Sequence, residues 1–168
     1  MEFDRTPYMA SFRASGCNFV LVTVHIYYGS GKFVRFREDE IRNFASFIQT
    51  RAEDQDVIDP DFVVLGDFNI EKIEDEYYKA LRSGGLCVPK EIQGLGTNLS
   101  KTMHYDQIAY HRYRDSTLIY TGRANRIDFV GAAFTDRPEK LQYDLTDHLP
   151  LWAEFTVSPD KNPRKINP

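Results

Sequence analysis

The stretch Val63-Val64-Leu65-Gly66-Asp67-Phe68-Asn69 is the part of the sequence from which the rest can be interpreted. Its apolar residues predict a short buried strand that stops at a glycine and then presents a carboxylate and a carboxamide. If the segment is extended, Phe68 points to the opposite side, and Asp67 and Asn69 face the same space. Oxygen donors of this kind suit a hydrated divalent cation and a phosphate. A strand end followed by an Asx turn is the structural alternative.

Two further apolar runs are bounded by polar residues that suit catalysis. His25 follows the run Phe19–Val24, and the pair Asp147-His148 precedes the run Leu149–Phe155. Adjacent residues of a strand point to opposite sides, so the aspartate and the histidine of the pair are expected to have different roles, as metal ligand and as acid or base. The alternatives are a structural histidine at position 25 and a surface Asp-His pair before a strand.

Asp106 stands at the start of another predicted strand. A carboxylate at this point could hold the imidazole of His148 in one tautomer, although it could equally cap a turn. Several strand ends that carry polar site residues predict one active site along an edge of a sheet.

Length and composition are those of one ordinary globular domain. The chain has 168 residues, of which 42% are hydrophobic and 27% charged, and this is enough for a hydrophobic core. Its net charge of −4 at pH 7 argues against a general electrostatic attraction to nucleic acid, but bound metal ions or a local basic patch could offset it at a nuclease site. The sequence has no signal peptide and no apolar run near the roughly 20 residues of a membrane span, so no membrane partner is predicted.

The two cysteines, Cys17 and Cys87, have neither CxxC nor Cys/His zinc spacing, so a structural zinc site is not predicted. Two reduced thiols in a cytoplasmic protein are favoured over a disulfide.

The periodicity of apolar residues predicts a mixture of strands and helices. The predicted strands are Tyr8–Phe12, Phe19–Ile26, Asp61–Gly66, Tyr105–Tyr110, Ser116–Tyr120, Arg126–Gly131 and Leu149–Val157, and the predicted helices are Arg37–Glu53 and Ile73–Leu81. Leu86–Met103 is a long irregular stretch, and residues 158–168 form a polar tail that is predicted to be disordered, so the domain is residues 1–157. This order predicts an α/β or α+β fold with a mixed, mostly antiparallel sheet.

The first predicted helix has the clearest pattern. One face carries the apolar residues Ile41, Phe44, Ala45 and Ile48, at spacings of i, i+3, i+4 and i+7. The acidic residues of its predicted first turn, where the helix dipole favours negative charge, are Glu38, Asp39 and Glu40.

The site motifs, taken in order, resemble one family. They are His25, Asp67-x-Asn69, Tyr105-Asp106 and Asp147-His148-Leu149-Pro150, each beside an apolar strand. This order resembles the endonuclease/exonuclease/phosphatase superfamily, which includes pancreatic deoxyribonuclease, abasic-site endonucleases, sphingomyelinases and inositol-polyphosphate 5-phosphatases. The resemblance extends from about Pro7 to Phe155, and Leu65–Asn69 and Thr146–Leu151 match the most specific motifs. It implies the C-terminal half of a four-layer α/β/β/α sandwich, with helices on one face of the sheet.

The resemblance implies divalent-metal-dependent phosphodiester hydrolysis, in which a metal-activated water attacks phosphorus. Asp67 would orient or deprotonate that water, and Asn69 would hold the scissile phosphate. Asp147 would bind Mg²⁺ or Mn²⁺, and Asp67 and Asn69 are further candidate ligands. His148, oriented by Asp106, would stabilise charge on a phosphate oxygen.

In the same family the histidine at the position of His25 assists at the side of the leaving group. The loop around Gly96-Thr97-Asn98 lies where such proteins often contact substrate, which makes Asn98 a candidate contact. Tyr28 and Arg35, just after His25, are candidates on position alone, and packing is the alternative role for the tyrosine. Nucleic acid, DNA or RNA, is favoured as substrate by the base rate of the family, and phosphomonoesters and lipid phosphodiesters are the alternatives.

The family domain is about twice as long as this chain. Its first half normally supplies an Asn and a Glu that bind the metal, and a carboxylate that pairs with the first histidine. No stretch before the first strand of this sequence could supply them, so the chain is expected to be a half-domain, either a fragment, an alternative start or an engineered half. The alternative to an enzyme is therefore a catalytically incomplete half that self-associates.

A half-domain with a single sheet would expose a large apolar face, which a second copy could cover. We therefore expect a symmetric homodimer in size-exclusion chromatography with light scattering. A single species near the monomer mass of 19.5 kDa would contradict this expectation.

Overall fold

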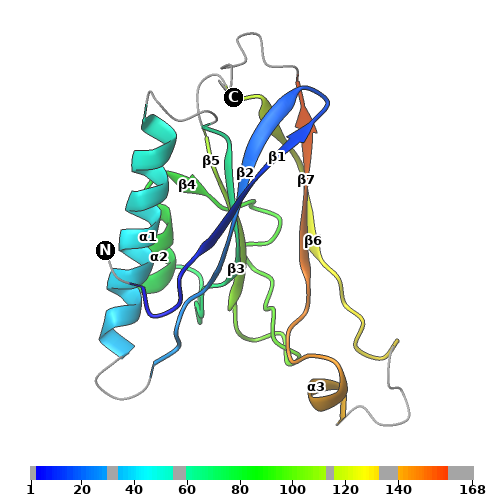
Figure 1. Ribbon diagram of the computed structural model, residues 1–168. Helices are drawn as coiled ribbons and strands as arrows, with labels where there is room; N and C mark the ends of the chain where they lie inside the picture. Colours follow the sequence, from blue (N-terminus) through cyan, green and yellow to red (C-terminus); the bar gives the residue numbers. More distant parts are fainter. Residues whose placement is uncertain (1–2, 30–33, 55–59, 113–115, 133–139, 159–168) are drawn as a thin grey trace.

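The computed structural model describes residues 3–29, 34–54, 60–112, 116–132 and 140–158 (Figure 1). Its strands are β1 (Tyr8–Ala14), β2 (Cys17–His25), β3 (Phe62–Asp67), β4 (Leu86–Cys87), β5 (Asp106–His111), β6 (Leu118–Arg126) and β7 (Leu151–Val157), and its helices are α1 (Val34–Glu53), α2 (Glu76–Arg82) and α3 (Leu141–Asp144).

Five strands form one mixed sheet in the order β1-β2-β3-β5-β4. β2 and β3 are parallel, and the other neighbouring strands are antiparallel. α1 and α2 lie together on one face of this sheet, and the two-stranded sheet of β6 and β7 lies on the other (Figure 1). The predicted fold class is therefore confirmed: the architecture is that of part of an α/β/β/α sandwich.

The core between α1 and the main sheet is built from the residues that the periodicity predicted. The apolar stripe of α1 is fully buried and comprises Ile41, Phe44, Ala45 and Ile48. The alternate residues of β2 and β3 that face it are Val20, Val22, Val24, Phe62 and Val64. α1 begins at Val34 rather than at the predicted Arg37, so its first turn contains no acidic residue.

The second sheet covers part of the opposite face of the main sheet. Tyr110 of β5 packs on Tyr120 of β6 and on Phe155 of β7, with ring centroids 5.5 Å apart in both pairs. The buried carboxylate of Asp61, just before β3, accepts the backbone N–H of Thr117 at 2.9 Å and so fixes the entry to β6. The expectation of a single sheet with a bare inner face is therefore wrong.

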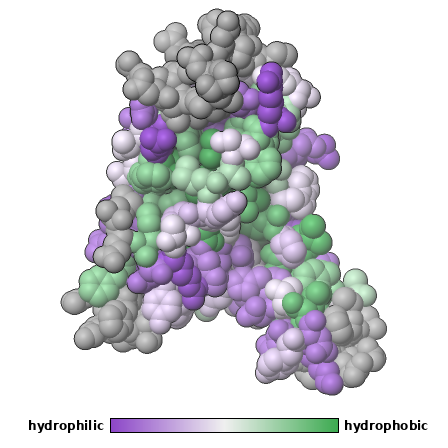
Figure 2. Space-filling model, viewed as in Figure 1, coloured by the Kyte–Doolittle hydropathy of each residue, from purple (hydrophilic) through white to green (hydrophobic). Residues whose placement is uncertain are grey.

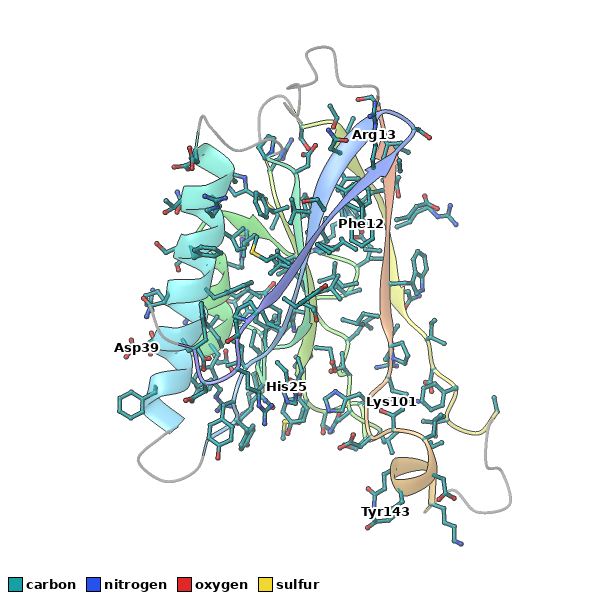
Figure 3. The ribbon with its side chains drawn as sticks, viewed as in Figure 1. Phe12, Arg13, His25, Asp39, Lys101 and Tyr143 are labelled. Atoms are coloured by element: carbon teal, nitrogen blue, oxygen red, sulfur yellow. The ribbon has the colours of Figure 1, made fainter. Side chains whose placement is uncertain are left out.

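The edge strand β1 nevertheless leaves apolar side chains in solvent. Phe12 stacks on Phe19 of β2 with ring centroids 5.7 Å apart, yet 46% of Phe12 is exposed, and Tyr8 of the same strand is 69% exposed. Figure 2 shows apolar side chains gathered over the upper part of the molecule, the region in which Figure 3 labels Phe12. A surface of this kind suits contact with another protein, and the homodimer stays a prediction.

The region between β5 and β7 differs most from the prediction. The strand that was predicted at 116–120 is longer than expected: β6 extends to Arg126, with a register shift between Tyr120 and Ala124. The separate strand that was predicted at 126–131 shares only Arg126 with β6. β6 ends at Arg126, which pairs with Leu151, the first residue of β7. The short helix α3 was not predicted.

The second predicted helix is shorter than expected at its start. α2 begins at Glu76 rather than at Ile73, because the side chain of Asp75 accepts the backbone N–H of Tyr78 at 2.7 Å and caps the helix there. Of the polar tail, residues 159–168 lie outside the described residues.

Two expectations concern the compartment of the protein. Cys17 and Cys87 are both thiols, as the sequence predicted. In the described part of the chain, no helix is long and apolar enough to cross a membrane.

Gly66 allows the two parallel strands to approach each other. Its φ of +133° is one that L side chains rarely adopt, and a Cβ at this position would lie 2.1 Å from the carbonyl oxygen of Val24 on β2. Gly66 pairs with Val24, one residue before the pair of His25 and Asp67. The glycine is therefore required for the register that brings the ends of β2 and β3 together.

We expect Gly66→Ala to lower the free energy of unfolding by about 2–4 kcal/mol, because it adds both a backbone clash and a strained φ. Gly94→Ala is the matched control, since no atom lies within 4 Å of its Cβ position. Urea unfolding followed by circular dichroism measures both variants. Equal unfolding midpoints for the two would contradict the role assigned to Gly66.

Candidate active site at the strand ends

Three residues lie side by side at one end of the main sheet. The register pairs His25 of β2 with Asp67 of β3, and Asp67 with Asp106 of β5. Residues directly opposite one another on neighbouring strands project from the same face, so these three side chains form a row across the sheet. The Nε2 atom of His25 lies 3.5 Å from Oδ2 of Asp67, and Figure 3 shows His25 at the lower end of the sheet.

His148 joins this row from the segment before β7. Its Nδ1 lies 2.6 Å from Oδ2 of Asp106. The fully buried Thr97 fixes both partners, since its Oγ1 accepts the backbone N–H of Asp106 at 3.0 Å and its carbonyl accepts the N–H of Leu149 at 2.6 Å. Because Nδ1 is held by the carboxylate, Nε2 of His148 is the nitrogen that remains for a ligand.

Asn69 reaches the site by a turn and not by an extended segment. Its φ of 52° is in the left-handed region, and its backbone N–H donates to Oδ1 of Asp67 at 2.8 Å, which is an Asx turn. The extended geometry that the sequence suggested for residues 67–69 is therefore wrong. The turn changes the direction of the Asn69 side chain, while the side chain of Phe68 is buried in the core. The Nδ2 group of Asn69 donates to the carbonyl of Ile26 at 2.7 Å, which fixes the orientation of the carboxamide.

Asp147 lies beside this cluster on the solvent side. Its side chain is 73% exposed, and its Oδ1 is 3.9 Å from Nε2 of His148. The structure thus brings together the carboxylates, the carboxamide and the histidines that the sequence singled out. They are His25, Asp67, Asn69, Asp106, Asp147 and His148.

The acidic surroundings change the protonation of His148. Burial lowers the pKa of its imidazole, but the hydrogen bond to Asp106 and the negative charges of Asp106, Asp67 and Asp147 outweigh burial, and the pKa is raised above 6.5. The pair therefore keeps its proton to a higher pH than a free imidazole does.

Comparison with known proteins identifies the fold. No family model and no curated protein matches the sequence. Among solved structures, the catalytic domain of human Nocturnin with a bound sulfate anion superposes with a TM-score of 0.62 and 19% identity over 94% of this chain and 55% of that chain. An endonuclease/exonuclease/phosphatase family protein from Bacteroides thetaiotaomicron gives 0.57 and 15% identity, over 93% and 57%. The chain has the endonuclease/exonuclease/phosphatase fold.

Two further structures of this fold carry informative ligands. TDP2 from D. rerio, in complex with a single-stranded DNA product, has a TM-score of 0.58 and 18% identity over 91% of this chain and 62% of that chain. A beta toxin mutant from Staphylococcus aureus with bound magnesium ions has a TM-score of 0.51 and 15% identity, over 89% and 57%. The chain thus spans between 55% and 62% of the lengths of these four structures. The resemblance to endonuclease/exonuclease/phosphatase proteins that the sequence predicted is confirmed at the level of the fold.

The donor groups present do not form a complete metal site. Within the described ranges, no group of three or more His, Cys, Asp or Glu side chains is arranged to hold a metal ion. Asp67 is engaged by Asn69 and lies near His25, and Asp106 is engaged by His148, so Asp147 is the carboxylate that is most open to an ion. Of the ligands predicted for the metal, Asp147, Asp67 and Asn69, the described structure therefore offers an incomplete set.

The three candidate substrate contacts are Asn98, Tyr28 and Arg35, and the first two differ in what their side chains bond to in the described structure. Asn98 accepts the backbone N–H groups of Thr102 and Met103 through its Oδ1, at 2.8 and 3.0 Å, so its carboxamide organises its own loop. Tyr28 is partly exposed and donates its hydroxyl to Glu71 at 3.0 Å. The side chain of Arg35 lies outside the described residues. Contact with substrate stays a prediction for all three.

Two side chains near the site had no role in the sequence prediction, although Tyr105 stands in one of the motifs. Tyr105 packs between Tyr28 and His148, with centroid distances of 6.3 and 5.8 Å. Arg37 of α1 is buried, and its Nη1 donates to the carbonyl of Asn69 at 2.7 Å. A signal for Arg37 was present, because it lies four residues before Ile41 and so falls on the apolar stripe of the helix, where a solvated arginine is not expected.

We expect Asp106→Asn to lower the pKa of His148, because it removes the hydrogen bond and the charge that oppose the effect of burial most strongly. A raised pKa in the folded state stabilises the fold below about pH 6.5, the value of an unperturbed histidine, and this contribution is lost as the pH rises through the folded value. NMR titration of the histidine ring protons in metal-free buffer measures the shift.

Asp144→Asn, which changes an exposed carboxylate of α3, is the control and should leave the titration of His148 unchanged. An unchanged His148 titration in Asp106→Asn would contradict the pairing.

Proposed function

We propose that this chain carries the phosphate-handling part of a phosphodiesterase site, with nucleic acid as the substrate class. The observation that supports the proposal is the row of His25, Asp67 and Asp106 with His148 bonded to its end. Two histidines and two carboxylates in fixed register at a strand-end edge are groups that bind an anion and move protons. A purely structural edge would not need four ionisable groups in contact.

Each group has a distinct task in the proposal. Asp67, held by the N–H of Asn69, orients the attacking water and accepts its proton. Asn69 binds a phosphate oxygen through the amide hydrogen that is not bonded to Ile26. His148, whose Nδ1 is bonded to Asp106, presents protonated Nε2 to a non-bridging phosphate oxygen and stabilises the charge that develops there. His25 assists the leaving group.

A divalent cation is the proposed cofactor, Mg²⁺ or Mn²⁺. Asp67, Asp106 and Asp147 concentrate negative charge at the place where a phosphate anion would have to bind, and the raised pKa of His148 is a consequence of that field. A hard cation on carboxylate oxygens would offset this charge. Asp147 is the proposed ligand from this chain, and the beta toxin neighbour holds magnesium ions. Further ligands have to come from outside the described residues.

The second candidate function is that of an incomplete half-domain whose main property is self-association. The incomplete ligand set of the described residues and the exposed apolar side chains of β1 favour this candidate. Within the enzyme reading, phosphomonoesters and lipid phosphodiesters are the alternatives to nucleic acid. The single-stranded DNA product in the TDP2 structure favours nucleic acid.

We expect the chain to nick supercoiled plasmid with Mg²⁺ or Mn²⁺ and to lose this activity with EDTA. The double variant Asp67→Asn/His148→Ala removes the group that orients water and the group that stabilises charge, so its rate should fall at least about 100-fold. Gel electrophoresis of the plasmid measures the conversion, and Asp144→Asn is the control that should keep the wild-type rate. Nicking that persists in the double variant would indicate a contaminating nuclease and contradict the proposal.

We also expect Mn²⁺ to bind in isothermal titration calorimetry and the binding to weaken about tenfold or more in Asp147→Asn, because a charged oxygen ligand is replaced by a neutral one. Asp144→Asn should bind as the wild type does. Absence of binding together with absence of nicking would support the incomplete half-domain.

A further inference from the structure

A charged side chain is buried behind the candidate site. Arg37 of α1 is 2% exposed. Its guanidinium carbon lies 4.0 Å from the ring centroid of Tyr77 and 4.5 Å from that of Tyr28. Nη1 donates to the carbonyl of Asn69 at 2.7 Å, and Nη2 donates to Oε1 of Glu71 at 3.1 Å. The guanidinium thus packs on two aromatic rings, and its hydrogen bonds go to Asn69 and Glu71, which follow β3.

Stability alone does not account for an arginine at this position. A buried charge loses its hydration, and buried ion pairs can often be replaced by apolar residues without loss of stability. In the described structure Nε of Arg37 has no hydrogen-bond partner, so the loss of hydration is only partly offset. Methionine is an unbranched apolar side chain that could pack against both rings. What methionine cannot supply is the pair of donors in fixed geometry.

Those donors act on the residue that carries the site turn. Asn69 has a left-handed backbone, which non-glycine residues adopt only when their surroundings hold them there. Its N–H is bonded to Asp67, its Nδ2 group to the carbonyl of Ile26, and its carbonyl to Arg37. Without Arg37 the carbonyl is released and the peptide after Asn69 can rotate. The left-handed backbone that aims the N–H of Asn69 at Asp67 is then held less firmly.

We propose that Arg37 is a positioning residue: from α1 it holds the carbonyl of Asn69 and thereby sets the orientation of the Asn69 carboxamide and of the Asp67 carboxylate. It contacts neither the attacking water nor the phosphate. The catalytic consequence rests on the proposed phosphodiesterase function, whereas the effect on the turn does not require activity.

The effect on the turn is tested by ¹⁵N NMR of the backbone and side-chain amides of Asn69. Arg37→Met and Arg37→Lys should both shift these resonances, because neither side chain reproduces the two donors. The control is Arg42→Met on the same helix, which breaks an exposed ion pair with Glu38 and should leave the Asn69 resonances in place.

Unchanged Asn69 resonances in either folded Arg37 variant would overturn the proposal. If Arg37→Met does not fold, Arg37→Lys, which keeps the charge and most of the length, decides the question.

The catalytic consequence is tested with bis(p-nitrophenyl) phosphate and Mn²⁺. Misplacement of a reacting group by about 1 Å reduces rates about 100-fold, so Arg37→Ala should lower kcat by about that factor and change KM by less than about threefold. Millimolar guanidinium should restore part of kcat in Arg37→Ala and none in Asp67→Asn.

An unchanged kcat in Arg37→Ala, or a loss that is confined to KM, would overturn the positioning role. A wild-type chain that is inactive on this substrate would count against the proposed function, and the NMR measurement alone would then decide the role of Arg37.

Discussion

The parallel pairing of β2 with β3 is the interaction on which the site depends. Ladder hydrogen bonds place His25 opposite Asp67, and the antiparallel ladder to β5 places Asp106 opposite Asp67. Because side chains alternate along a strand, a slip of one residue would move Asp67 to the other face of the sheet. Gly66 sits directly before this row, where the carbonyl of Val24 leaves no room for a side chain. Gly66 thus allows the register that places Asp67 beside His25.

The hydrophobic core supports the turn at residues 67–69. Phe68 lies between the two polar residues of the turn, is fully buried, and packs on Phe44 of α1 with ring centroids 5.9 Å apart. Truncation of a buried phenylalanine costs about 3–5 kcal/mol in typical cores, which indicates how firmly such a side chain anchors its backbone. Arg37 reaches the same turn from the same helix. α1 therefore supports the site through one apolar and one charged contact.

The features that the sequence predicted well are encoded locally. The stripe from Ile41 to Ile48 follows from helical spacing, and the polar strand ends at His25, Asp67 and Asp106 follow from where apolar runs stop. The features that it missed depend on distant partners. β6 ends at Arg126 because β7 begins at Leu151.

The geometry at Asn69 shows the same limit. This residue turns because Ile26 and Arg37, which are distant in sequence, bond to it, so an extended reading of residues 67–69 could not anticipate the turn. The number of ligands that meet at one point is likewise a tertiary property. Metal-binding residue types can be read from the motifs, but their assembly into a site cannot.

The acidic surroundings of His148 matter as much as the incomplete set of metal ligands among the described residues. Carboxylates raise the pKa of His148, and the same acidic groups would face a phosphate that approaches the site. The proposed cation would offset this charge, and the ligands that the described residues do not supply would have to reach this edge of the sheet. β1 borders β2 there: Tyr8 pairs with Thr23, two residues before His25. A second polypeptide that covered the exposed residues of β1 would thus end close to the row of site residues. Covering the apolar surface and completing the site could in that case be achieved by the same contact.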